Sequence, residues 1–495
     1  MDTKFLKTLL LFIGSCLWVS CTDEEQSNDN PQETISNEIY YANMLGKDIM
    51  SELYYWNEEI AGDLMQWNIT TNGDPIGTVD RIRYHEGDKY IDKWTMMTND
   101  MDSFTSSVGG VSTTFGWNLT PYLLSPNSIE CIGVVNYVSA GSPAEKAGLK
   151  RGDVLWSING KSITTDNYLD LYYASSLTAS LAYIDWENGS IGDSGKEVEL
   201  TAVTMYENPI LCDTVYEFNG KKVGYLAYTS FDLISIPELI EVGKKFKSEG
   251  IKELVLDLRY NGGGYVITEN VLASMFAPKA NVDAKDIFEK EKYNAYLTEA
   301  YRLQGISTET PFMTKYDYEN DKISLHVSTK DANIGLERIY GLISPNTASA
   351  SEALLSGLMP YMDVRLIGET SHGKYCTGLM MSGEDAYENC PKEIKNWGVY
   401  VMVSIYQNAA GETPCMPDGL QPDTPVQDDQ IPLYQLGDVN EPLLRAALTQ
   451  AGKQYDRPNA RSRSMSPAFQ HIDVPQKPVF GKRILLPSVN MPVIN

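Results

Sequence analysis

An alternation of strand-like and helix-like segments, beginning near Gly220, most constrains the fold of this chain. Such an alternation favours an α/β core with partly parallel strands, because two parallel neighbours need a long crossover, usually a helix, between them. Residues 278–335 fit this rhythm poorly, and we interpret them as an insertion. The strand-like runs lie at residues 223–228, 254–258, 339–343 and 364–367, and the helical runs at residues 236–248 and 350–359.

Length and composition predict a multidomain chain of two to four domains, of which the core is α/β. The chain has 495 residues, of which 42% are apolar, so it can build more than one hydrophobic core. Residues 34–104 open with a helical run at 34–65 and are expected to form a small N-terminal helical domain. A strand-rich segment follows at 105–206, then the α/β core at 207–452. The basic tail at 453–495 lacks periodicity and is expected to wrap the surface or stay partly disordered.

The charge of the chain bears on its partners. The formal net charge is −26, which argues against a nucleic-acid partner, since contacts to phosphate need Lys and Arg. Only the tail is clearly basic, with seven basic residues against two acidic ones.

Residues 1–21 have the pattern of a secretion signal. Two lysines precede an apolar run at 9–19, which is too short for a membrane-spanning helix. The following Ser20 and Cys21 resemble the lipobox of bacterial lipoproteins, in which the cysteine is lipidated and becomes the mature N-terminus. That resemblance implies a lipid anchor at Cys21, an acidic tether at 22–33 and a place in the cell envelope, on the outer membrane facing the periplasm or the cell surface. The alternative is a signal peptide without lipidation, cut at another position.

Cysteine spacing indicates no metal site. Besides Cys16 and Cys21, the chain has five cysteines, and none stands in a CxxC or Cys/His arrangement typical of zinc. An oxidising envelope permits a disulfide, for which Cys390 and Cys415 are a candidate pair. We predict neither a metal nor a cofactor.

A further pattern lies in the strand-rich segment. Residues 141–155 read GSPAEKAGLKRGDVL, in which a proline suits the first turn of a short helix and a glycine ends it before a new strand. This run resembles the GSPAxxAGLxxGDxI signature of bacterial PDZ domains. The resemblance implies that a loop at Phe115, Gly116 and Trp117 holds the C-terminal carboxylate of an extended peptide, beside a helix at 166–176. The alternative is a PDZ domain that only braces its neighbours.

Three segments of the α/β core combine residue types that chemistry needs. Residues 257–264 (DLRYNGGG) end in three glycines, whose backbone can turn sharply and present amides to a ligand. Residues 344–355 (SPNTASASEALL) join a strand to a helix. The N-terminus of a helix stabilises negative charge that develops beside it. Residues 368–374 (GETSHGK) end in a lysine. Each pattern alone has an ordinary explanation, as a loose loop, a helix cap or a surface charge, and no Gly-Lys-Ser/Thr follows the glycines to suggest a P-loop.

Together these segments resemble the C-terminal-processing, or tail-specific, serine peptidases of family S41. The family combines a DLRxNxGG loop, an SASE helix start and a GxxTxGK loop, and GLQPD at 419–423 resembles its later GIxPD segment. Lys374 follows Ser349 by 25 positions, the spacing that this family uses between nucleophile and base. The resemblance covers residues 35–450 and implies a peptidase core of the S41, crotonase-like spiral type at 207–452.

The resemblance assigns roles to the residues that match the family motifs. They are Ser349 as nucleophile, Lys374 as base, the backbone amides of Ala350 and of Gly263 or Gly264 as oxyanion hole, and Glu352 and Ser371 as supporting side chains.

A lysine must lose its proton before it can act as a base. Its ordinary pKa is about 10.4, and burial can lower that value by about 3–5 units. Histidine is scarce: only four are present, and a Ser-His-Asp triad through His372 is the alternative. One departure is Gly378, which stands where many family members have a glutamine that orients the lysine. Ser371 or a nearby carbonyl is expected to take over that role.

These patterns predict a serine endopeptidase of the cell envelope with a Ser/Lys dyad. Its substrates would be proteins or peptides with free C-termini, recognised through the PDZ domain, and its contact with the membrane would run through Cys21. The alternative, motivated by Gly378, is a weak or inactive peptidase fold that serves as a peptide-binding lipoprotein.

Overall fold

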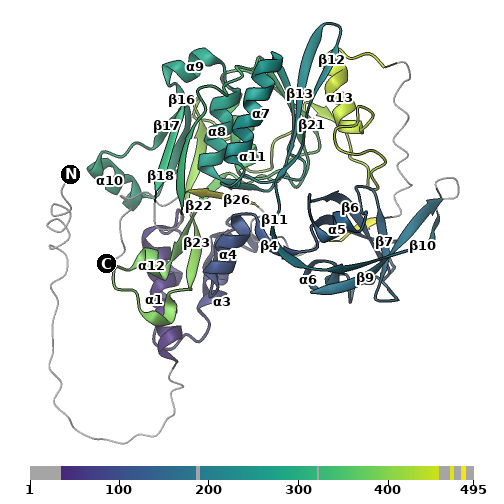
Figure 1. Ribbon diagram of the computed structural model, residues 1–495. Coiled ribbons are helices and arrows are strands. Elements are labelled where there is room, and N and C mark those ends of the chain that lie inside the picture. The colour runs from purple at the N-terminus through teal and green to yellow at the C-terminus, as the bar shows by residue number, and fades with distance from the viewer. Residues whose placement is uncertain (1–34, 186–189, 320–322, 456–468, 473–480, 486–495) are drawn as a thin grey trace, which may run out of the picture.

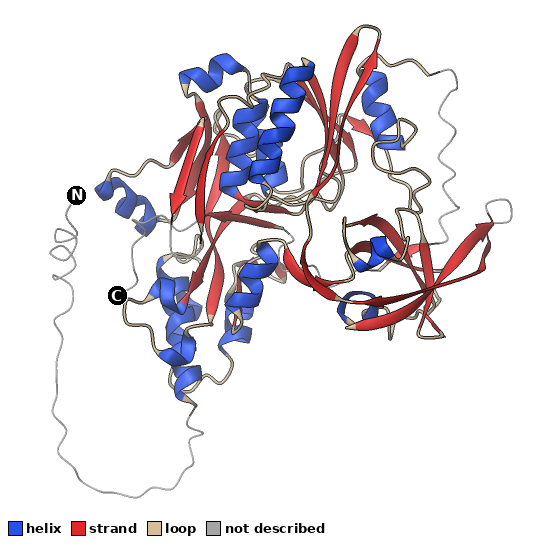
Figure 2. Cartoon of the chain, viewed as in Figure 1, coloured by secondary structure: helices blue, strands red, loops and turns tan. Residues whose placement is uncertain are grey.

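The computed structural model describes residues 35–185, 190–319, 323–455, 469–472 and 481–485 (Figure 1). The predicted signal segment with Cys21, the acidic tether and most of the basic tail lie outside the described residues. The described chain is a mixed α/β, multidomain structure, as the sequence predicts (Figure 2).

The N-terminal part is mainly helical but shares its core with the rest of the molecule. The helical run predicted over 34–65 ends at Glu52, and a second short helix follows after a turn. Side chains of Trp56, Trp67 and Phe104 belong to the same apolar cluster as the α/β core. The elements are α1 (Asn37–Glu52), α2 (Ala61–Gln66), α3 (Pro75–Ile82), β1 (His85–Glu86), β2 (Lys89–Tyr90), β3 (Met96–Thr98) and α4 (Met101–Val108).

The strand-rich segment folds around a separate apolar core. Its main sheet runs in the order β10-β9-β7-β6-β5-β25, with antiparallel neighbours throughout. The helix predicted at 166–176 is shorter, since it covers only Asp170–Tyr173. The elements are β4 (Val111–Thr114), β5 (Trp117–Leu123), β6 (Cys131–Val138), α5 (Pro143–Lys146), β7 (Val154–Ile158), β8 (Lys161–Ser162), α6 (Asp170–Tyr173), β9 (Ser176–Asp185), β10 (Ser190–Thr201), β11 (Val203–Tyr206) and, from the tail, β25 (Gln470–His471).

A six-stranded sheet forms the centre of the α/β core, in the order β12-β13-β14-β20-β21-β24. Strands β13 to β24 are parallel, as the strand–helix alternation predicts. The sheet lies between α13 on one face and α7, α8 and α11 on the other (Figures 1 and 2). Alternate side chains of its strands belong to the two apolar clusters that include these helices. The elements are β12 (Ile210–Phe218), β13 (Lys221–Tyr228), α7 (Ile236–Glu249), β14 (Glu253–Asp257), α8 (Val266–Phe276), β20 (Arg338–Ile343), α11 (Ala350–Leu358), β21 (Asp363–Gly368), β24 (Thr424–Pro425) and α13 (Pro442–Gln450).

A second sheet packs beside the first, in the order β15-β26-β22-β23-β16-β17, with β3 paired to β23. Residues 278–335 are therefore not a peripheral insertion, because β16 lies inside this sheet. The elements are β15 (Gly263–Tyr265), α9 (Lys279–Ala284), β16 (Ile287–Tyr293), α10 (Ala295–Gln304), β17 (Glu309–Pro311), β18 (Lys315–Glu319), β19 (Ser324–Ser328), β22 (Cys376–Ser382), α12 (Gly383–Ala386), a 3-10 helix (Lys392–Ile394), β23 (Gly398–Asn408) and β26 (Lys482–Leu485).

The described parts of the tail differ from the expectation of a surface wrapping. Residues Gln470–His471 pair with β5, and Lys482–Leu485 pair with β15 and β22 in the interior of the second sheet. Lys482, Arg483 and Ile484 are buried there. The tail therefore contributes to two sheets that lie in different parts of the molecule.

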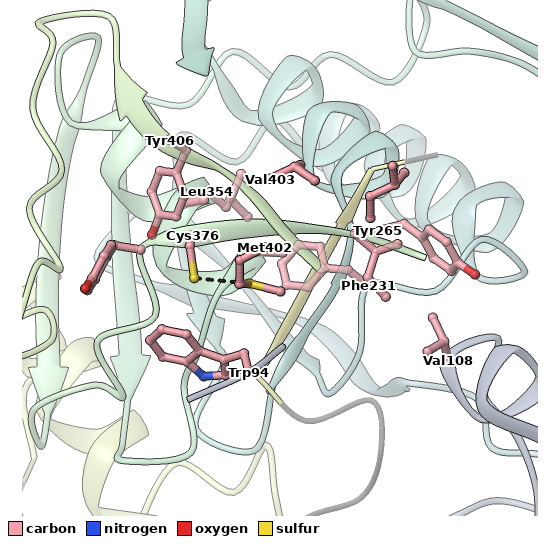
Figure 3. Packing of buried hydrophobic residues seen from close by; sticks show 14 of the residues in the cluster. Trp94, Val108, Phe231, Tyr265, Leu354, Cys376, Met402, Val403 and Tyr406 are labelled. Atoms are coloured by element: carbon pink, nitrogen blue, oxygen red, sulfur yellow. Dashed lines mark hydrogen bonds between the residues drawn. The ribbon is translucent and has the colours of Figure 1, made fainter. Parts of the chain in front are cut away.

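Apolar side chains from the second sheet, from α11 and from the loop after β13 meet in one cluster (Figure 3). Leu354 of α11, Met402 and Val403 of β23 and Phe231 are each completely buried in it. Trp94, from the N-terminal part, belongs to the same cluster. The N-terminal part is thus held on the core by direct packing.

All five described cysteines are free thiols, so the disulfide considered between Cys390 and Cys415 is not formed. The thiol of Cys376 lies 3.2 Å from the sulfur of Met402 (Figure 3). Within the described ranges, no three His, Cys, Asp or Glu side chains cluster as metal ligands would. Among the helices of those same ranges, none is long and apolar enough to cross a bilayer.

Candidate active site

Ser349 lies at the junction of a buried loop and the first turn of α11. Its backbone has φ 66° and ψ −114°, a conformation that is strained for any residue with a side chain. The side chain is fully buried, and its hydroxyl makes no hydrogen bond to any described residue. A strained, unpartnered hydroxyl at a helix N-terminus is the arrangement expected of a nucleophile.

Glu352 connects Ser349 to the lysine loop. Its Oε2 accepts hydrogen bonds from the backbone amides of Ser349, at 2.7 Å, and of Lys374, at 2.9 Å. Its Oε1 accepts from the amide of Gly373 at 2.7 Å and from the hydroxyl of Ser371. One carboxylate therefore fixes the backbones of both predicted dyad residues next to each other. Burial raises the pKa of Glu352 to about 7.

Lys374 is completely buried beside this carboxylate. Burial lowers the pKa of its amine to about 8, so about one amine in ten is neutral at pH 7. The amine donates a hydrogen bond of 2.9 Å to the hydroxyl of Tyr400 and lies 5.5 Å from the ring centroid of Trp94. It makes no hydrogen bond to Ser349, whose hydroxyl is unpartnered. The structure thus brings the two residues together without the hydrogen bond of an assembled dyad.

Tyr400, and not a side chain at residue 378, holds the amine of Lys374. The tyrosine hydroxyl accepts from Lys374 and donates to the carbonyl of Arg483 at 3.1 Å, which fixes its position. A Cβ at residue 378 would lie 2.3 Å from the Tyr400 ring, so the tyrosine fills the space that a longer side chain at 378 would need. Ser371 does not take this role as expected, because its hydroxyl bonds Glu352 and accepts from the amide of Leu420.

The signal for Tyr400 was weak in the sequence. It lies in a strand beyond the three motifs, and a tyrosine in an apolar strand is usually a packing residue.

His372 does not form a triad with Ser349. The unpartnered hydroxyl of Ser349 excludes a hydrogen bond between them. The imidazole lies 6.5 Å from the ring of Trp94, and burial lowers its pKa.

The glycine loop packs directly against Ser349. The Cβ of Ser349 lies 2.9 Å from the point that a Cβ of Gly263 would occupy, so only glycine fits at this contact. The amide of Gly263 donates to the side chain of Asn261 at 2.9 Å, while the amide of Ala350, as the first of α11, has no acceptor within its own helix. Of the predicted oxyanion donors, Gly263 therefore has its amide engaged, whereas the amide of Ala350 has no acceptor in its own helix.

Buried ion pairs of Arg259 fix the glycine loop. Arg259 bonds Asp257 at 2.9 Å and Glu441 at 2.5 Å, and all three side chains are buried. Arg151, from the strand-rich segment, reaches the same group: it lies 3.9 Å from Glu441 and bonds the hydroxyl of Tyr260. The strand-rich segment therefore contacts the glycine loop through a buried arginine.

The predicted peptide-binding loop consists of Phe115, Gly116 and Trp117 of the strand-rich segment. Phe115 and Trp117 point into the core of the strand-rich segment, where the Trp117 indole donates to the carbonyl of Leu171 at 2.9 Å. Gly116 has φ 77°, and a Cβ there would lie 2.1 Å from Ser142. Any peptide contact from this loop consequently falls to its backbone.

Two segments of the chain match known protein families. Residues 222–426 match the profile of peptidase family S41, and residues 134–175 match that of the PDZ domain. The chain is 26% identical over 244 residues to the carboxy-terminal processing protease CtpA of Bacillus subtilis. The aligned region is 47% of this chain and 42% of CtpA. It is also 26% identical over 322 residues to a carboxyl-terminal-processing protease of Picosynechococcus. This aligned region is 62% of this chain and 64% of the relative. The chain thus spans less than two thirds of the length of these relatives.

A solved structure agrees with this assignment. An S41-type protein from Bacteroides fragilis superposes with a TM-score of 0.64 at 22% identity, over 87% of this chain and 99% of that one. The fold is therefore shared. The resemblance to the S41 peptidases and to PDZ domains is confirmed by these matches.

The contact between Gly378 and Tyr400 gives a prediction about stability. Gly378→Ala places a methyl group against a buried ring and should lower the free energy of unfolding by about 1–3 kcal/mol, measured by urea denaturation. In a Tyr400→Leu background the same change should cost less than about 0.5 kcal/mol, because the ring is gone. Gly62→Ala is the control: it lies in α2 with nothing within 4 Å of its added Cβ. Equal costs of Gly378→Ala in both backgrounds would contradict this packing.

Proposed function

We propose that this chain, which carries an S41 peptidase domain and a PDZ domain, is a serine endopeptidase with Ser349 as nucleophile and Lys374 as base. The observation that carries the proposal is a buried lysine of lowered pKa held, through Glu352, beside a buried and strained serine. Few structural roles require both features at one place.

The reaction follows from the positions of these groups. The hydroxyl of Ser349 attacks the carbonyl carbon of a peptide bond while its proton passes to the neutral amine of Lys374. The negative charge that develops on the carbonyl oxygen is stabilised by the amides of Ala350 and Gly264. The protonated lysine then gives its proton to the nitrogen of the peptide bond, the C–N bond breaks and the amine departs. The acyl group stays on Ser349 as an ester, which water hydrolyses to free the serine hydroxyl. The hydroxyl of Tyr400 holds the lysine amine in place between these transfers.

Substrates of this peptidase would be proteins or peptides with free C-termini. The names of the relatives, carboxyl-terminal-processing proteases, support this choice, and so does the PDZ domain, a fold that binds extended peptide ends. Arg151 gives such a domain a direct contact with the glycine loop.

We place the protein in the cell envelope, anchored by a lipid on Cys21, on the basis of the N-terminal sequence. Growth with a radiolabelled fatty acid should label the wild-type chain and not Cys21→Ser. Equal labelling of both chains would contradict the anchor.

The second candidate function is a peptide-binding protein without catalysis. The absence of a hydrogen bond between Ser349 and Lys374, together with the complete burial of both side chains, favours it. The two candidates differ in a single chemical property, the reactivity of Ser349.

Substitution of the dyad tests the proposal. Ser349→Ala and Lys374→Met should each lower the rate of casein cleavage by about a thousandfold or more, because the first removes the attacking hydroxyl and the second removes the amine that accepts its proton. His372→Gln is the matched control and should retain wild-type activity, since His372 makes no hydrogen bond to the hydroxyl of Ser349. Mapping of a fluorophosphonate probe should locate the label on Ser349. Cleavage by Ser349→Ala at the wild-type rate would refute the proposal.

The lowered pKa of Lys374 predicts a dependence on pH. The neutral amine is the active form, so kcat/KM should rise about tenfold per pH unit below about 8 and level off above it. Below about 7 the fall should steepen, because protonation of Glu352 weakens its hydrogen bonds to the backbone. A profile that still rises at pH 10 would mean that the lysine is not buried in the working enzyme.

Tyr400→Phe should lower kcat about tenfold with little change in KM, as expected for a positioning residue.

A further inference from the structure

Strand β26 of the chain's own tail lies between the two halves of the candidate site. It pairs in parallel with β15, where Lys482 is opposite Gly263, and with β22, where Ile484 is opposite Gly378. Strand β15 belongs to the glycine loop, and β22 begins two residues after Lys374. Without β26, these two strands would present open edges to each other across a slot one strand wide.

The tail reaches the immediate surroundings of the nucleophile. The carbonyl oxygen of Lys482 and the Cβ of Ser349 lie 2.4 and 2.9 Å from the point that a Cβ of Gly263 would occupy. Ser349 and Lys374 are both fully buried. A second extended peptide therefore has no room at Gly263 while β26 is in place.

Arg483 anchors this strand by charge. Its guanidinium is fully buried and bonds Glu269 at 2.8 Å, as well as Glu289, Glu291 and Thr377. The three glutamates are themselves buried, and the charge of any one of them would be costly without a cation. The slot is thus built to receive an extended segment that carries an arginine.

The side chain of Lys482 occupies a second, aromatic position. Its amine lies 3.5 Å from the carbonyl oxygen of Trp94 and 4.4 Å from the ring centroid of Tyr400, the residue that also holds Lys374. Burial and the nearby Lys374 lower the pKa of Lys482 to about 7. The tail therefore places a second amine against the residue that positions the base.

An earlier segment of the same tail lies on the PDZ domain. Strand β25 pairs antiparallel with β5, with His471 opposite Tyr122, and the amide of Ile472 donates to the carbonyl of Pro121 at 3.1 Å. Strand β5 begins at Trp117, the last residue of the predicted carboxylate-binding loop. PDZ domains bind peptides by this kind of strand addition. One tail thus occupies the edge of a peptide-binding fold and the slot beside Ser349.

We propose that the slot between β15 and β22 is the acceptor site for an extended substrate peptide with a basic residue at the position of Arg483, and that β26 fills this site in cis. The proposal rests on the proposed function, because it takes Ser349 as the nucleophile. The described state is then self-occluded, and external peptides enter only in the fraction of molecules whose tail has left the slot.

Variants of the full-length chain test this occupancy. Ile484→Pro puts a residue without an N–H, and with a fixed φ, in the middle of β26, and Arg483→Ala removes the anchor. Both should raise the rate of fluorophosphonate labelling of Ser349 by about tenfold if nine in ten wild-type molecules are occluded. Gln454→Pro is the matched control, a proline at an exposed position of the same tail outside both strands, and should label as the wild type does.

A peptide added in trans tests the specificity of the slot. A synthetic peptide with the sequence of residues 478–488 should slow the labelling of Ile484→Pro back towards the wild-type rate. The same peptide with Ala in place of Arg483, or with Pro in place of Ile484, should need at least about tenfold higher concentration, since it lacks the charged anchor or the strand pairing.

Amide hydrogen exchange gives a measurement that does not depend on the variants folding. In full-length Ser349→Ala, saturating unfolded casein should speed exchange at residues 482–485 while β15 and β22 stay protected. Unchanged exchange with bound casein, or equal labelling of folded wild type and Ile484→Pro, would show that β26 is a permanent strand and overturn the proposal. Absence of labelling at Ser349 in every variant, with exchange still increased, would instead contradict the peptidase function and leave the acceptor site standing.

Discussion

The buried carboxylate of Glu352 is the interaction on which the rest of the site depends. It accepts hydrogen bonds from the backbone amides of Ser349, Gly373 and Lys374, and it binds the hydroxyl of Ser371. A buried carboxylate is tolerated only with such partners, so the two loops are fixed together or not at all. The strained backbone of Ser349 is stable because the same carboxylate binds its amide. From this contact follow the burial of Lys374, its lowered pKa and its position beside the serine.

Much of the fold and of the site can be predicted from the sequence, because the signals are local. The strands and helices at 223–258 and at 339–367 follow from short periodic runs, and the motifs around Ser349 and Lys374 each follow one strand. Tyr400 could not be predicted in the same way. Its contact with Gly378 depends on the antiparallel pairing of β22 with β23 and on a shift of register between Thr377 and Gly378, which no local pattern encodes.

The tail escaped prediction for a different reason. Strand β26 begins with two charged residues, and neither the alternation nor the length of a typical strand is present. It becomes a strand because two open edges and three buried glutamates surround it. Its stability is therefore a property of the site that it fills rather than of its own sequence. The same dependence joins Arg483 of the basic tail to three buried glutamates of the peptidase domain.

The proposed chemistry depends on Lys374 being a buried amine that loses its proton near neutral pH. The most direct measurement is a carbon-13 NMR titration of the full-length chain labelled at the ε-carbon of lysine, with the Lys374 signal identified by its loss in Lys374→Met. The structure predicts a midpoint near 8, because burial disfavours the charged form of Lys374. A midpoint near 10.4, the value of an ordinary lysine, would contradict the account, since such an amine would be almost fully protonated and unable to activate Ser349 at neutral pH.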